Sequence, residues 1–390
     1  MQVMIIEDDA WMADLIKQIV LKLRPQADVS CFERVDAARA AWLAAPCQLI
    51  ISDWNLPGES GVSLLEEIRQ QDSQVPILII TGRADRDSVL QVRRLRINAF
   101  VTKPFKVPKL LEQLATLLPE QEEQTSAPES VPPDFMTYLA ELSPEQLDLP
   151  LLDDTQKLLE QHLHGEQLDL RQLISQIQHD TALSARLIAA ANTPEYNSSG
   201  KPCISLYESL QLLGVSTSLN LALAPCLQRS CQLRSGVLRL YAQAHIDEAE
   251  QLYEHARELA LQLKLQPWPF QSAALLQRMG ELCVLHQAQN WEDLGHSLED
   301  QQLLAALQRY SRDFADALKD NWRLPVPLLE LINATHALPS GNLKRELILM
   351  RLAAVELSTT VDDPEQQRLR RLLGLPDASA STDAAPNDTP

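Results

Sequence analysis

The sequence predicts a multidomain protein in which a doubly wound α/β domain precedes an all-α domain. Four short apolar runs near the start of the chain alternate with helical patterns, as the strands of a parallel sheet do; they span residues 3–6, 49–52, 76–80 and 99–102. An acidic segment rich in Pro, Ser and Glu follows at residues 119–133. Beyond it, apolar residues recur at helical spacing and strand signals are few. The chain therefore divides into a sheet-containing part and a helical part.

Polar residues follow each of the four apolar runs. They are Glu7, Asp8 and Asp9 after the first run, Asp53 and Asn55 after the second, Thr81 after the third and Lys103 after the fourth. The carboxyl ends of parallel strands lie at one edge of the sheet, where ligands bind in this class of fold. We therefore expect the acids, the hydroxyl group and the amine to lie close together, although they are far apart in sequence.

Such a cluster suits phosphoryl transfer. Carboxylates gathered in one pocket repel each other, and a hard divalent cation such as Mg²⁺ removes this repulsion by binding their oxygen atoms. One carboxylate can then attack an incoming phosphoryl group, because the reaction requires mainly positioning and charge neutralisation. Lys103 would neutralise phosphoryl oxygen charge, and the Thr81 hydroxyl group would bond another phosphoryl oxygen.

Residues 1–118 resemble the receiver domain of two-component response regulators, which is a CheY-like domain. The matching segments are MIIEDD, ISDWNLPG, ILIITG and AFVTKPF. The resemblance implies a flavodoxin-like, five-stranded parallel sheet, with Mg²⁺ as cofactor and a histidine kinase as phosphoryl donor. It also implies that Asp53 is the phosphoacceptor and that Thr81 and Lys103 contact the phosphoryl group. Phe100 would be the switch aromatic and, lacking a tyrosine hydroxyl group, would act by packing alone.

The same resemblance implies a set of metal ligands. Asp8 would be the main acidic ligand beside Asp53, Glu7 would act mostly through water, and Asn55 would offer its backbone carbonyl. Asp9 has a simpler interpretation as the N-cap of the helix that begins near Trp11.

Charge and composition limit the remaining functions. The chain has 390 residues and a formal net charge of −19, which argues against binding to a nucleic-acid backbone. Its six cysteines are scattered without CxxC pairs, as is typical of reduced thiols rather than of disulfides or a zinc site. No apolar run approaches the roughly 18 residues of a membrane span, and no basic, apolar leader precedes the first strand. We expect a cytoplasmic protein with no membrane insertion.

Helical stripes predict the organisation of the second part. Leu183, Leu187 and Ile188 share one helical face, as do Leu252, Ala256, Leu259 and Leu263 further along. We expect the following boundaries: receiver 1–118, acidic linker 119–138, helical domain 139–357, C-terminal helix 358–373 and disordered tail 374–390.

The helical part is similar to an HDOD domain, the HD-related output domain of bacterial signalling proteins. Two segments carry the resemblance: residues 174–215, and the sequence DNWRLPVPLLELINATH at 320–336. HD-type phosphohydrolases need neighbouring His and Asp ligands for their metal. Gln277 and Arg278 stand where the central pair would be, and an arginine does not coordinate metals. His255 and His336 are the remaining ligand candidates, so we predict a domain that is not an enzyme.

Three further groups have a functional and a plain structural interpretation. His179-Asp180 could bind a metal, but Asp180 precedes a natural helix start and is better read as an N-cap. Asn192 is expected to cap the end of the same helix. Five arginines could dock on the acidic linker or the helical domain, or simply face water; they are Arg83, Arg86, Arg93, Arg94 and Arg96.

The two resemblances together predict a response regulator. A histidine kinase would phosphorylate Asp53, and phosphorylation would change the contacts of the helical domain with an unidentified downstream protein. Homodimers form through receiver faces in this family. Two alternatives for the helical domain stay open, namely a sensor that binds a nucleotide second messenger and a residual HD-type phosphohydrolase.

Overall fold

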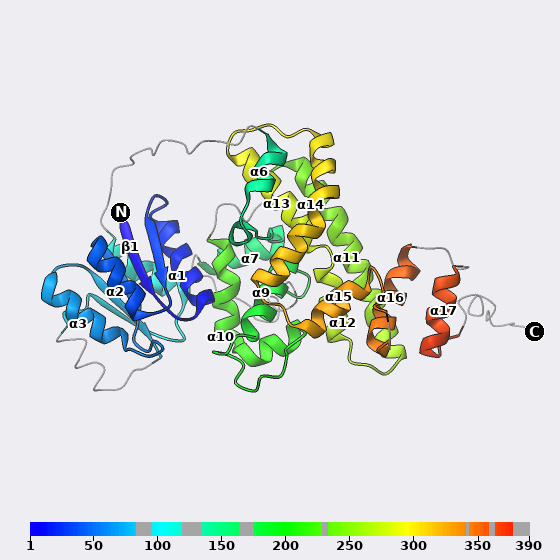
Figure 1. Ribbon diagram of the computed structural model, residues 1–390, viewed down its shortest axis with the longest axis horizontal. Helices are drawn as coiled ribbons and strands as arrows, with labels where there is room; N and C mark the ends of the chain where they lie inside the picture. Colours follow the sequence, from blue (N-terminus) through cyan, green and yellow to red (C-terminus); the bar gives the residue numbers. More distant parts are fainter. Residues whose placement is uncertain are drawn as a thin grey trace, which may run out of the picture. The chain divides into compact units, whose positions relative to one another are not determined.

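The structure is a computed structural model (Figure 1). It describes residues 1–82, 95–118, 134–163, 175, 177–227, 233–340, 343–358 and 363–376. The chain folds into two compact units. The first comprises residues 1–130, 156–169 and 213–229, and the second comprises 131–155, 170–212 and 230–390.

A five-stranded parallel sheet forms the centre of the first unit and confirms the predicted fold. The strands are β1 (Gln2–Ile6), β2 (Asp28–Phe32), β3 (Leu49–Asp53), β4 (Ile77–Thr81) and β5 (Ala99–Thr102), in the order β2-β1-β3-β4-β5. All residues of β3 and β4 are buried, which explains why apolar residues run without a break through 49–51 and 77–80. The edge strand β2 is only partly covered, and its Cys31 is exposed.

The described helices of the sheet domain are α1 (Ala10–Leu23), α2 (Val35–Ala44), α3 (Gly61–Gln71) and α5 (Val107–Leu117). One apolar cluster joins α2 and α3 to one face of the sheet; it includes Val35, Trp42, Leu65, Ile50 and Ile77. Helix α1 packs against α5. Asp9 is the N-cap of α1, because its Oδ1 accepts hydrogen bonds from the amides of Trp11 (2.9 Å) and Met12 (3.2 Å).

The remainder of the described chain is helical. Its helices are α6 (Phe135–Glu141), η1 (Pro144–Gln146), α7 (Asp153–Leu163), α9 (Thr181–Ala191), α10 (Leu206–Cys226), α11 (Gly236–Gln262), α12 (Trp268–Leu276), α13 (Met279–Asp293), α14 (Asp300–Asn321), α15 (Val326–Ala334), α16 (Arg345–Ser358) and α17 (Pro364–Leu373). The predicted stripes on α9 and α11 are buried. No described helix is long and apolar enough to cross a membrane.

Helix α6 begins inside the predicted linker 119–138. Phe135 is buried, its ring lies 5.9 Å from that of Trp291, and the Tyr138 hydroxyl group donates to Gln287 Oε1 at 3.0 Å. Residues 135–138 are therefore part of the helical structure. Residues 119–133 lie outside the described part of the chain, as do residues 377–390 of the predicted tail.

Two features of the backbone depend on glycine. A Cβ atom on Gly280, at the start of α13, would lie 1.9 Å from the Ser311 carbonyl oxygen of α14, so only glycine allows this contact. Gly214 has φ 72° and interrupts α10. Before this break, the Leu206 amide donates to Ser272 Oγ at 3.1 Å in the second unit. After it, Asn220 Nδ2 donates to the Phe105 carbonyl oxygen at 3.0 Å in the first unit.

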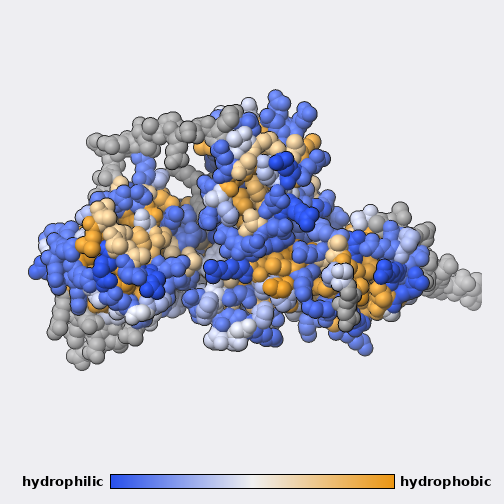
Figure 2. All heavy atoms as spheres, in the orientation of Figure 1, coloured by the Kyte–Doolittle hydropathy of each residue, from blue (hydrophilic) through white to orange (hydrophobic). Residues whose placement is uncertain are grey.

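The face of the molecule shown in Figure 2 is mostly polar where it is coloured, as expected for an acidic chain. Figure 2 shows hydrophilic residues over much of the visible face, with apolar residues gathered in smaller areas between them. Single exposed apolar side chains are ordinary on protein surfaces, so only a group with further distinguishing features calls for a functional explanation.

Candidate functional site

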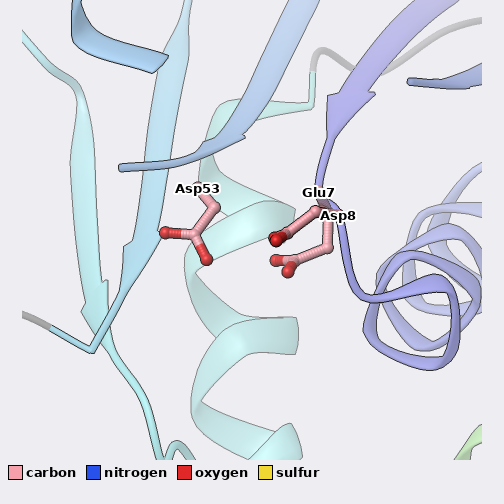
Figure 3. Close-up of side chains that lie close together, drawn as sticks. All are labelled: Glu7, Asp8 and Asp53. Atoms are coloured by element: carbon pink, nitrogen blue, oxygen red, sulfur yellow. The ribbon is translucent and has the colours of Figure 1, made fainter. Parts of the chain in front are cut away.

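Three carboxylates converge at the carboxyl ends of two neighbouring strands. Glu7 and Asp8 follow β1, and Asp53 is the last residue of β3. Because β1 and β3 are parallel neighbours, their ends bring the three side chains together, and Figure 3 shows them pointing toward one another. One oxygen atom from each residue lies within 4.8 Å of the others. The predicted convergence of these acids is therefore found in the structure.

Lys103 supplies a positive charge to this pocket. Its Nζ atom lies 2.7 Å from Asp53 Oδ2, and it donates to both Glu7 oxygens at 2.7 and 2.9 Å. The loop after β5 places it there, since its own amide donates to the Thr81 carbonyl oxygen at 2.7 Å. The Glu7 and Asp53 side chains are only 1% and 9% exposed, so this charge pairing is shielded from water.

The pocket shifts the titration of its members. Burial, opposed by the Lys103 charge and reinforced by Asp53, raises the pKa of Glu7 to about 8. Burial alone would lower the pKa of Lys103, but the charges of Glu7 and Asp53 outweigh it, and the pKa is raised above its ordinary value. Lys103 is therefore a permanent cation, whereas Glu7 exchanges a proton near neutral pH.

The other predicted residues surround this centre. The backbone amide of Asn55 donates to Asp53 Oδ1 at 3.0 Å, and Asn55 itself is exposed. Thr81 is fully buried at the end of the neighbouring strand β4. Phe100 is half-buried against the apolar cluster that contains Ile77 and Ile79.

Sequence reasoning missed two residues that support Asp53 from behind. A Cβ atom on Gly61 would lie 2.2 Å from the Asp53 carbonyl oxygen, so the start of α3 approaches the site only because residue 61 is glycine. The Ser52 hydroxyl group donates to the same carbonyl oxygen at 2.8 Å. The last residue of the segment NLPGESG, Gly61, was the available signal, but only the folded chain shows what it contacts.

The donor atoms fit a small, hard cation. Three carboxylates offer oxygen ligands alone, and with the Lys103 ammonium group they leave a local charge of −2 when all are ionised. Mg²⁺ is held in proteins by one or two carboxylates, with waters and phosphate oxygens completing its shell. Glu7, Asp8 and Asp53 are thus the residues that would hold it.

The candidate ligands of the helical domain do not form a comparable cluster. Gln277, Arg278 and His336 line a cavity of about 480 Å³. Arg278, however, lies between two acids, 2.6 Å from Glu248 and 2.7 Å from Glu281. His255 Nε2 lies 2.6 Å from Glu356 Oε2 instead. A guanidinium group therefore occupies the centre of this acidic pair.

Asp180 has a structural role. It is the N-cap of α9, with Oδ1 accepting from the Leu183 amide at 3.0 Å and Oδ2 from the Leu152 amide at 2.9 Å. Its complete burial raises its pKa to about 6, against the opposing effect of these hydrogen bonds. His179 lies 3.8 Å from Glu250 rather than joining Asp180 at a site. Asn192 caps the other end of α9, donating to the Ile188 carbonyl oxygen at 2.7 Å.

Of the five arginines of the predicted docking group, Arg96 alone lies within the described residues. Arg83, Arg86, Arg93 and Arg94 lie outside the described residues. Arg96 is described and has a positive φ of 49°; its carbonyl oxygen accepts from Arg69 at 3.2 Å. The docking hypothesis for these five residues stays a prediction.

Comparisons with known proteins agree with both domains. The response regulator receiver domain model matches residues 3–115, and the HDOD domain model matches residues 149–338. The chain is 28% identical to the chemotaxis protein CheY of Pseudomonas aeruginosa over 118 residues, which cover 29% of this chain and 93% of that protein. It is 29% identical to the transcriptional regulatory protein FixJ of Bradyrhizobium diazoefficiens over 142 residues, covering 36% and 68% of the two chains.

Among solved structures, the MmoQ response regulator of Methylococcus capsulatus is 19% identical and gives a TM-score of 0.45, covering 60% of this chain and 96% of its own. The family matches and the receiver relatives carry the assignment, and they agree with the acidic pocket at the ends of β1 and β3. The chain therefore contains a response regulator receiver domain at residues 3–115 and an HDOD domain at residues 149–338.

Proposed function

We propose that a histidine kinase phosphorylates this protein on Asp53 and that the phosphoryl group gates protein contacts made by the HDOD domain. The observation that carries the first half is the set of three carboxylates within 4.8 Å, with Lys103 bonded to both Glu7 and Asp53. In the transfer, an Asp53 oxygen attacks phosphorus, the phosphorus–nitrogen bond of the donor histidine breaks, and an acyl phosphate forms. Mg²⁺, when bound by Glu7, Asp8 and Asp53, would neutralise charge on the phosphoryl oxygens.

The chain's own residues would position and stabilise the phosphoryl group. Lys103 already lies 2.7 Å from the Asp53 oxygen, so its ammonium group can follow the charge from the carboxylate to the new phosphoryl oxygens. The backbone amide of Asn55 donates a hydrogen bond to the other Asp53 oxygen and thereby orients the nucleophilic carboxylate. Thr81 ends the adjacent strand, where its hydroxyl group can turn toward a phosphoryl oxygen, and Phe100 would then repack.

Support for gating comes from the loop that carries Lys103. Two residues beyond it, the Phe105 carbonyl oxygen accepts a hydrogen bond from Asn220, which lies within the residues matched by the HDOD model. Both residues are buried and belong to the first compact unit. A shift of Lys103 toward a phosphoryl group would therefore act on a loop that is directly bonded to α10. The output would be a change in protein contacts in the cytoplasm.

The electrostatics of the HDOD cavity support an output that is not hydrolytic. Arg278 holds the position that a metal would need. Its positive charge is neutralised by Glu248 and Glu281. The cavity itself, at about 480 Å³, is the one observation that favours the sensor alternative. Arg278 is already paired with Glu248 and Glu281, which leaves little positive charge for the phosphates of a cyclic dinucleotide. A thermal-shift screen of the purified protein with cyclic dinucleotides separates the two, since only a sensor would be stabilised.

A phosphorylation assay tests the first half of the proposal. Acetyl phosphate and Mg²⁺ should add one phosphoryl group to the protein, detected by mass spectrometry of the intact chain, and none to Asp53→Ala. Asp36→Asn is the matched control, because Asp36 is an exposed acid on α2 that pairs with Arg34. Modification of both variants alike would refute Asp53 as the acceptor.

A capture experiment tests the second half. Wild-type protein held active by Mg²⁺ and beryllofluoride, which mimics the phosphoryl group, is compared with Asp53→Ala as bait in the same lysate and buffer. A protein retained by only one bait would identify the output and show that Asp53 controls it. Identical catches would disprove gating while leaving the phosphorylation result intact.

A further inference from the structure

An exposed aromatic pair marks a small pocket in the second compact unit. The rings of Tyr207 on α10 and Trp268 on α12 are stacked, with centroids 4.9 Å apart and planes 16° apart. Both side chains remain substantially exposed, at 48% and 42%. Two large rings that shield each other yet face solvent are costly for an isolated domain, and aromatic residues of this kind are enriched at protein interfaces.

The pocket beside this pair has apolar walls. Leu210 of α10, Leu275 of α12 and Tyr253 of α11 line it together with the two rings. Trp268 and Leu275 are seven residues apart and so lie on one face of α12. The bond from the Leu206 amide to Ser272 Oγ fixes the two wall helices α10 and α12 at this point. This hydrogen bond joins the two wall helices in the absence of any ligand.

Gln271 gives the pocket a specific polar requirement. Its side chain lines the pocket and is 4% exposed, and its Oε1 atom is buried without a hydrogen-bond partner among the described residues. A buried acceptor without a hydrogen-bond partner raises the free energy of the unbound protein. A ligand that brings a donor removes this cost and so binds more tightly. The occupant should thus carry an N–H or O–H group beside an apolar body.

Size and charge select among occupants. The pocket measures about 70 Å³, roughly half of the ~150 Å³ cavity that accommodates benzene, so it admits one aliphatic side chain rather than a fused ring system. One acid lies near these walls: Glu250, about one helical turn before Tyr253 on α11, is 3.8 Å from His179, whose ring centroid lies 5.5 Å from that of Tyr253. The surroundings therefore favour a positively charged partner.

We propose that this pocket is a docking site for a short segment of another protein that carries one aliphatic side chain next to a Lys or Arg. The aliphatic group enters between Trp268, Leu210 and Leu275, a backbone amide of the segment donates to Gln271 Oε1, and the basic residue faces Glu250. This rests on the proposed function, because it names the chemistry of the partner whose binding the HDOD domain would control.

Selection of short displayed random peptides on immobilised full-length protein tests the proposal. Wild-type protein should enrich peptides with Leu, Ile, Val or Met within two positions of Lys or Arg. The best peptide is then synthesised, and its affinity is measured by fluorescence anisotropy. Trp268→Ala and Gln271→Leu should each weaken binding about tenfold or more, as loss of an interface anchor does. Leu294→Ala is the control, because Leu294 is 58% exposed and does not line this pocket.

Several outcomes would overturn the proposal. They are enrichment without the aliphatic–basic pattern, peptides that bind Trp268→Ala as well as wild type, and a wild-type dimer in sedimentation that Trp268→Ala dissociates. The last result would make a second copy the occupant. If peptide binding is absent while the two capture baits still retain different proteins, gating survives and only this pocket is wrong. If peptides bind as proposed but the baits retain the same proteins, the pocket stands and gating fails.

Discussion

The receiver pocket and the HDOD cavity each place a basic side chain between two acids, but they do so to different ends. Lys103 bridges Glu7 and Asp53, whereas Arg278 bridges Glu248 and Glu281. In the receiver, the acids are almost completely buried and Asp8 adds a third carboxylate, so negative charge is left over for a metal. In the cavity, Glu248 is 53% exposed and water already stabilises the charges. The receiver carboxylates can therefore bind and release a metal cation, whereas in the HDOD cavity the Arg278 side chain is itself the cation.

Removing Lys103 should have the largest effect on this contrast. Lys103→Ala should slow phosphorylation by acetyl phosphate about a hundredfold or more, the usual result when a preorganised charge is lost from a transition state. Mg²⁺ should bind at least as tightly as in wild type, because a competing cation has left the carboxylates. Mass spectrometry over time and isothermal titration calorimetry measure the two effects. A parallel loss of Mg²⁺ binding would show that Lys103 holds the acids together rather than competing at them.

The buried acids of the two domains should respond to pH in characteristic ways. Asp180 has a native pKa of about 6, above its ordinary value of 3.8, so the folded protein binds this proton more tightly than the unfolded chain. Its contribution to the free energy of unfolding is therefore full at low pH and falls as pH rises through about 6, by up to about 3 kcal/mol. Asp180→Asn removes this dependence and costs about 1 kcal/mol, because a single amide oxygen cannot replace both carboxylate oxygens that accept from Leu183 and Leu152.

Urea unfolding followed by circular dichroism, at about pH 4.5 and about pH 7.5, measures the change. The stability difference between wild type and Asp180→Asn should shift in favour of the variant as pH rises. A difference that is the same at both values would mean that the two backbone amides hold Asp180 ionised throughout this range.

Glu7 should couple metal binding to pH. Its pKa of about 8 means that a proton competes with Mg²⁺ at neutral pH. The apparent Mg²⁺ affinity should rise with pH up to about 8, by at most about tenfold per unit, and then level off. Glu7→Gln should bind more weakly and show a flatter profile in the same calorimetric titrations. An unchanged slope in the variant would assign the pH dependence to another group.

The smallest effect is expected at the cation of the HDOD cavity. Arg278→Ala removes two ion pairs, of which that with the exposed Glu248 is largely screened by water, so the free energy of unfolding should fall by only about 1 kcal/mol. Phosphorylation at Asp53 and Mg²⁺ affinity should not change. Chemical denaturation measures the first effect, and the assays above measure the others. A loss of several kcal/mol would show that this cluster, like the receiver pocket, is effectively buried.

The sequence predicted the receiver better than the helical domain, for physical reasons. Buried parallel strands such as β3 and β4 contain uninterrupted apolar runs, and their carboxyl ends determine where Asp53 and Thr81 lie. The edge strand β2 had no such pattern because only part of it is covered. The sequence placed Lys103 near these acids, but its hydrogen bonds to both Glu7 oxygens were not predicted, because they depend on where the loop after β5 holds the amine.

In the helical domain, the N-cap at Asp180 was predictable because capping depends on a few consecutive residues. Its second hydrogen bond, from Leu152, was not, and neither was the place of Arg278 between Glu248 and Glu281. Such contacts depend on how helices pack, which helical periodicity does not encode. For the same reason residues 135–138 of α6 were assigned to the linker, although Phe135 packs against Trp291 from far along the chain.

The uncovered edge strand β2 makes the receiver accessible to thiol chemistry. Of the five cysteines in the described part of the chain, Cys31 is exposed and the other four are buried. A maleimide dye should therefore label Cys31 first among these five, and slowly at neutral pH, because partial burial raises the pKa of its thiol. Ile5 of β1 is its partner in the sheet, two residues before Glu7. A dye there would place an optical reporter beside the strand that carries the acids, without altering any residue of the pocket.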